Sequence, residues 1–158
     1  MRNTITIERN GLQQQIDLRN HYMGESAKRK DPDATTIQSS KDDKDLLRMF
    51  IDRACNELVT AVALRFPYIS CTAGEENIEI IFDTEKEYPE HLLPMLEQSI
   101  INYLVNEAIM QWLLLRRPEM AHSYISLKAT LYSNVQHLFA KIYSRKRVRR
   151  RATDLAGI

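Results

Sequence analysis

The stretch between Pro94 and Pro118 constrains the fold of this chain more than any other. Apolar side chains recur there at helical spacing on more than one face, and the run from Ile109 to Leu115 is apolar nearly all round. A helix of this kind must be covered by neighbours on several sides. We therefore expect a central helix that begins near Pro89 to Pro94, where proline is tolerated in a first turn, carries Arg116-Arg117 at its end and is stopped by Pro118.

Two more long helices are expected on either side of it in the sequence. A capping serine at 39 or 40 and an apolar stripe predict a helix over about 42–66, which Pro67 ends. A third helix is expected from Pro118 or Glu119 to about Arg147. The tight connection before it predicts an antiparallel hairpin with the central helix.

The first 40 residues are polar and carry weaker signals. Alternation predicts a short strand over Thr4–Glu8, and helical spacing predicts a helix over Leu12–Met23 that stops at Gly24. Glu25–Ser40 is expected to be a loop. The predicted division is an N-terminal arm and linker over 1–40, a helical domain with a short β element over 41–145, and a basic tail over 146–158. The predicted fold class is a mainly α bundle of three principal long helices with an N-terminal helical arm and a small β element.

A second strand is expected over Asn77–Thr84, after a loop over Tyr68–Glu76. It must pair either with Thr4–Glu8 or with a copy in another subunit, because a lone strand leaves backbone groups unpaired. Helices of about 25 residues reach roughly 37 Å, a length that favours a core completed by neighbouring chains. The expected subunit contacts are Ile5, Ile7, Ile78, Ile80, Phe82, Glu79 and Asp83.

Charge is distributed unevenly along the chain. Residues 1–140 contain 15 basic and 20 acidic residues, a balance of −5, whereas residues 141–158 contain seven basic and one acidic residue, a balance of +6. Three interpretations of the basic end stay open: a solvated helix end, a contact with the nucleic-acid backbone, and an arm inserted into an acidic partner. The candidate portal or DNA contacts are Arg145, Lys146, Arg147, Arg149, Arg150 and Arg151.

An acidic cluster surrounds the second predicted strand. Such a cluster is typical of a solvated face, and its other use is to dock a basic segment such as 141–151 of an adjacent copy. Its members are Glu75, Glu76, Glu79, Asp83, Glu85, Glu87 and Glu90.

Several classes of chemistry find no support in the residue pattern. The four histidines are scattered, Cys55 and Cys71 lack metal-ligand spacing, and no nucleophile elbow or phosphate-binding glycine loop is present. Cys55 is expected to be a small core residue. Neither a metal, a cofactor nor an enzymatic activity is expected, and neither secretion nor membrane spanning is indicated.

Two stretches carry a resemblance to a known family. They are His21–Lys28 (HYMGESAK) and, after a polar spacer, Asp42–Cys55 (DDKDLLRMFIDRAC), with a later helix that ends in Leu114-Leu115-Arg116-Arg117. This arrangement resembles the small helical head-to-tail connector proteins of tailed bacteriophages, also called neck, adaptor or head-completion proteins. In that family an acidic Asp-x-x-Leu-Leu start opens the first long helix, a short β element follows, and a further long helix ends near basic residues.

The resemblance implies a structural virion protein that forms a ring, typically with twelve copies, beneath the portal. Expected partners are further copies of the chain, the portal protein, other neck or tail proteins and the backbone of the exiting DNA. The expected location is the neck of the virion, after assembly in the host cytoplasm. The alternative hypothesis is a helical protein that binds nucleic acid without sequence preference through residues 141–151.

Overall fold

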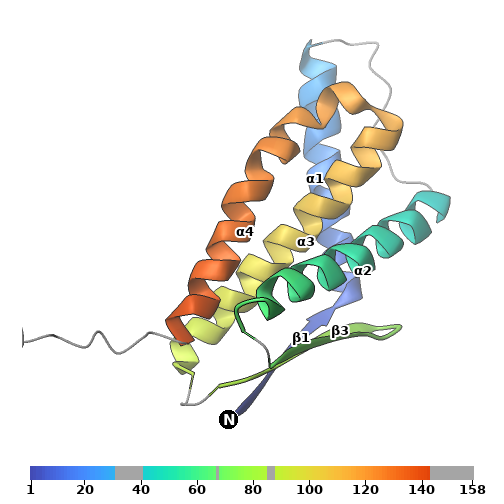
Figure 1. The fold of residues 1–158 in the computed structure, drawn as a ribbon. Coiled ribbons are helices and arrows are strands. Elements are labelled where there is room, and N and C mark those ends of the chain that lie inside the picture. Colours follow the sequence, from blue (N-terminus) through green and yellow to red (C-terminus); the bar gives the residue numbers. More distant parts are fainter. Residues whose placement is uncertain (31–40, 67, 85–87, 143–158) are drawn as a thin grey trace, which may run out of the picture.

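The protein is mainly helical, with one small antiparallel sheet (Figure 1). The computed structural model describes residues 1–30, 41–66, 68–84 and 88–142. Within these residues the helices are α1 (Arg9–Lys30), α2 (Lys41–Ala63), α3 (Leu93–Arg116) and α4 (His122–Ile142), and the strands are β1 (Arg2–Glu8), β2 (Ile69–Ala73) and β3 (Asn77–Asp83). Short 3-10 turns over Glu90–Leu92 and Pro118–Met120 precede α3 and α4.

Helix α3 lies at the centre of the helical part, as its sequence predicts. Twelve of its residues are buried, among them Leu96, Ile100, Leu104 and Ile109. The other three helices lie around it (Figure 1), and α1, α2 and α4 all pack against it. Burial on all these sides explains why this segment has almost no polar face.

The sheet confirms one predicted pairing and adds a strand. Its order is β1-β3-β2, with Ile5 opposite Ile80 on one side and Cys71 opposite the same residue on the other. The pairing of β3 with the N-terminal strand therefore occurs within one chain. The predicted loop over Tyr68–Glu76 is wrong, because β2 forms there.

Residues 1–30 are part of the body of the protein rather than of an arm. Leu12 and Ile16 are fully buried, and α1 packs against α3. Helix α1 also continues through Gly24, so the predicted stop at that glycine and the loop predicted from Glu25 are wrong as far as Lys30. Tertiary packing overrides the local turn and stop signals here. Residues 31–40 lie outside the described part of the chain.

The ends of the other helices agree closely with the sequence. Helix α2 runs over Lys41–Ala63 instead of 42–66, and its buried Asp43 accepts a hydrogen bond from Arg116 at the end of α3, with 3.0 Å between Nη2 and Oδ1. Helices α3 and α4 form the expected hairpin (Figure 1). The last part of the predicted third helix, 143–147, lies outside the described residues.

The apolar residues predicted as subunit contacts lie in the core of the single chain. This corrects their assignment, because side chains that the chain already covers offer nothing to a neighbour. Their exposed fractions are 3% for Ile5, 2% for Ile7, 0% for Ile78, 1% for Ile80 and 3% for Phe82. Phe82 also packs edge-on against Phe139 of α4, with 5.4 Å between ring centroids, and so joins the sheet to the helices.

We expect Ile80→Ala to lower the free energy of unfolding by about 2–5 kcal/mol, because it leaves a cavity between the sheet and the helices. Glu79→Ala, on the exposed face of the same strand, serves as the matched control and should change the stability by no more than about 0.5 kcal/mol. Urea denaturation of both variants measures the difference. Equal losses from the two substitutions would contradict the burial of this face.

Candidate subunit interface

The turn between β2 and β3 presents an exposed acidic surface. Gly74 donates its N–H to the carbonyl oxygen of Asn77 at 2.9 Å, and a Cβ at Gly74 would lie only 3.0 Å from that oxygen, which favours glycine here. Glu75, Glu76 and Glu79 are exposed and line a hollow of about 440 Å³ together with Thr72, Gly74 and Asn77. We call Glu75, Glu76 and Glu79 the acidic hairpin surface.

Two hydrogen bonds from Arg9 to backbone carbonyl oxygens hold this hairpin against α1. The side chain of Arg9, the first residue of α1, donates from Nε to the carbonyl oxygen of Gly74 at 2.8 Å, and its backbone N–H donates to the carbonyl oxygen of Glu76 at 2.9 Å. Within the described part of the chain, none of the three glutamates forms an ion pair with a basic residue. Their charge is thus available to a cationic group from outside.

The two acidic residues predicted as subunit contacts differ in their surroundings. Glu79 is exposed on the acidic hairpin surface. Asp83 is half-buried at the other end of β3, and its Oδ1 lies 3.3 Å from Nε of Arg2. The structure therefore leaves Glu79, and not the five apolar candidates, on a surface that a neighbour can reach.

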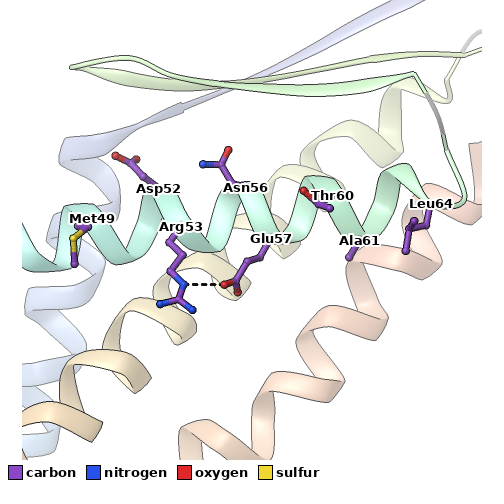
Figure 2. Close-up of a pocket in the computed structure, with 8 residues that line it drawn as sticks. All are labelled: Met49, Asp52, Arg53, Asn56, Glu57, Thr60, Ala61 and Leu64. Carbon is purple, nitrogen blue, oxygen red and sulfur yellow. Dashed lines mark hydrogen bonds and ion pairs between the residues drawn. The ribbon is translucent and has the colours of Figure 1, made fainter.

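A groove along α2 is a surface that the sequence did not indicate. It has a volume of about 710 Å³ and is lined by Met49, Asp52, Arg53, Asn56, Glu57, Thr60, Ala61 and Leu64. Figure 2 shows Met49, Arg53, Glu57, Ala61 and Leu64 on the side of α2 away from the sheet, with Arg53 paired to Glu57.

Two large apolar side chains stand out in this α2 groove. Met49 is 55% exposed and Leu64 is 86% exposed, although both lie on or directly after a helix with a well-covered apolar stripe. Because Met49 lies off that stripe, its position in the helix could have indicated a second apolar surface. Exposed apolar groups lining one groove are typical of an interaction surface.

A buried carboxylate lies between α3 and α4. Glu107 is almost fully buried, its Oε2 lies 3.0 Å from Nζ of Lys128, and its Oε1 has no hydrogen-bond partner in the described part of the chain. Burial raises the pKa of Glu107, against the effects of Lys128 and Arg53, which lower it; Glu57 raises it further. The site therefore holds a buried carboxylate whose ion-pair partner is one partly exposed lysine.

The basic candidates all fall after the last residue that the structure describes, Ile142. Arg145, Lys146, Arg147, Arg149, Arg150 and Arg151 lie outside the described residues.

Other kinds of site receive no support from the described part of the chain. Among those residues, no group of histidine, cysteine, aspartate or glutamate side chains could hold a metal ion. Likewise, none of the helices described combines the length and apolar character that a bilayer crossing requires.

Comparisons with known proteins add no further assignment. No protein-family model matches the chain, and searches of curated proteins and of solved structures find no similar protein.

We expect Lys128→Met to destabilise the protein by about 1–3 kcal/mol at neutral pH, because Glu107 then stays buried without a cation. Folding raises the pKa of Glu107. Ionisation of this carboxyl group therefore lowers the stability of the fold as the pH rises from the pKa in the unfolded chain to the higher pKa in the folded chain. The loss caused by Lys128→Met should therefore shrink near pH 4, where the carboxyl group is protonated. Urea denaturation at the two pH values measures it.

Two controls accompany this measurement. Adding Glu107→Gln to the lysine variant should restore most of the lost stability at neutral pH, since no buried charge remains. Arg2→Met, which breaks an exposed ion pair, should cost no more than about 1 kcal/mol. A loss that is equally large at both pH values would contradict the role assigned to Lys128.

Proposed function

We propose that this protein is a structural subunit of the head-to-tail connector ring of a tailed bacteriophage, which docks on the portal and surrounds the DNA exit channel. The mainly helical body with a short β element is of the kind that the sequence resemblance implies. Its proposed partners are further copies of the chain, the portal protein and other neck or tail proteins, and its proposed location is the neck of the virion.

One observation carries the proposal: the acidic hairpin surface and the end of α4 lie on opposite sides of the molecule. In Figure 1 the turn between β2 and β3 points to the right, whereas α4 ends at the lower left. The arginine-rich segment follows α4 in the sequence and has a balance of +6 over residues 141–158. Contact between unlike surfaces on opposite sides is heterologous, and such contacts generate rings when the rotation closes.

The α2 groove supplies a second surface for assembly. Its exposed Met49 and Leu64 would bury apolar area against a neighbouring copy or the portal, which favours association. In this arrangement, the opposite charges set the direction and speed of assembly, while the apolar groove contributes to its affinity.

A charge exchange tests the proposed contact between copies. We expect Glu75→Lys, Glu76→Lys and Glu79→Lys together to prevent ring formation in the presence of portal, because like charges then face each other. Reversing Arg147, Arg149, Arg150 and Arg151 to glutamate should have the same effect. A chain that carries both sets should form rings again, as seen by native mass measurement and single-particle imaging.

Different results would contradict the charged contact between copies and the connector function. Rings that form unchanged with either single set of reversals would contradict the charged contact but leave the connector function standing. An unmodified chain that stays monomeric and does not bind portal would contradict the connector function itself.

The second candidate function is binding of nucleic acid without sequence preference, and the +6 balance of residues 141–158 favours it. No aromatic residue lies within the Arg145–Arg151 run, so contact would be with phosphates rather than stacked bases.

Replacing Arg147, Arg149, Arg150 and Arg151 by alanine should weaken DNA binding and flatten its dependence on salt, by roughly 0.9 in the logarithmic slope for each phosphate that the variant no longer neutralises. Fluorescence anisotropy with duplex DNA at several salt concentrations measures both quantities. Unchanged affinity and slope would exclude this function.

A further inference from the structure

The two cysteines of the chain meet where the sheet packs on α2. Cys55 of α2 is fully buried and Cys71 of β2 is half-buried. Their Sγ atoms lie 2.7 Å apart, although 16 positions separate them in the sequence. This separation is only about 0.7 Å longer than a covalent S–S bond.

The surroundings of the two thiols give them different reactivities. The hydrogen bond with Cys55 lowers the pKa of Cys71, and the charge of Arg9 acts in the same direction, against the effects of burial and Asp52. The same hydrogen bond and complete burial raise the pKa of Cys55. Since the thiolate is the nucleophile, the partly exposed Cys71 reacts first and Cys55 second.

Arg9 supplies a fixed positive charge beside this pair. Its Nη2 donates to Oδ1 of Asp52 at 2.6 Å, and its Nε holds the hairpin at Gly74. Its Nη1 is buried and has no hydrogen-bond partner in the described part of the chain. A thiolate on Cys71 would place a negative charge near this guanidinium group, which stabilises the reactive form.

We propose that Cys55 and Cys71 form an intrachain disulfide that cross-links α2 to β2 on exposure to a low-molecular-weight disulfide such as oxidised glutathione. The Cys71 thiolate attacks one sulfur atom of that disulfide, which forms a mixed disulfide and releases one glutathione thiolate. Cys55 then attacks Sγ of Cys71, which releases the second glutathione as a thiolate, and the protons given up by Cys71 and Cys55 end on the two released glutathione molecules. The two cysteines are oxidised by two electrons in total, and one disulfide reagent is reduced to two thiols.

This cross-link would fasten an edge strand to the helix beneath it. Among the described strands, β2 pairs only with β3. The position of β2 is therefore held by that one set of backbone hydrogen bonds and by its packing against α2. The disulfide would therefore hold the acidic hairpin surface in place whether or not other chains are bound.

The test uses the full-length chain, first reduced and then incubated with oxidised glutathione. We expect the monomer to lose the mass of two hydrogen atoms, to resist alkylation of both cysteines after unfolding, and to yield one peptide pair joined through Cys55 and Cys71. Closing a loop of about 16 residues should also raise the Tm by roughly 6–12 °C. Two alkylatable thiols after this treatment, or disulfides only between chains, would overturn the proposal.

Single variants test the order of reaction. Cys55→Ser should retain glutathione on Cys71 as a stable mixed disulfide, because no second thiol can displace it. Cys71→Ser should leave Cys55 unmodified in the folded chain, because that thiol is buried. Glutathione on Cys55 in the folded Cys71→Ser variant would overturn the assigned order of reaction. If a variant does not fold, the mass and alkylation measurements on the unmodified chain still test the disulfide.

Discussion

Burial of α3 on several sides is the constraint on which the rest of the structure depends. Leu96, Ile100, Leu104 and Ile109 are all fully buried, so the helix exists only with other elements packed around it. The chain supplies these elements itself: α1, α2 and α4 pack against α3, and β1 packs near it from the sheet. This arrangement draws the first 30 residues into the body and covers the apolar stripes that would otherwise need a neighbouring chain.

Much of this fold could be predicted from the sequence, and the errors have physical reasons. The central helix and the alternating strand at Asn77–Asp83 have strong periodic patterns, which local sequence reports well. β2 was missed because Ile69–Ala73 mixes small and polar residues, and only pairing with β3 makes it a strand. The extent of α1 was missed because Gly24 is a strong local stop signal that packing overrides.

The candidate site was less predictable, because surfaces depend on how distant segments meet. The alternation of apolar and polar residues along β3 predicts which face of the strand is buried. It does not predict whether the chain's own helices or another subunit cover that face. Glu79 was placed on the surface because it alternates with buried neighbours. The contact of Cys55 with Cys71 has no signal in their spacing, since it arises only from the packing of β2 on α2. The proposed assembly would use the acidic hairpin surface and the α2 groove, both of which the described part of a single chain forms by itself.

The midpoint of urea unfolding at different chain concentrations, without portal, tests this central claim most directly. Because each chain covers its own core, the account predicts the same midpoint over a roughly hundredfold range of concentration. A midpoint that rises with concentration would contradict it, because a core completed by neighbouring chains is stabilised by mass action.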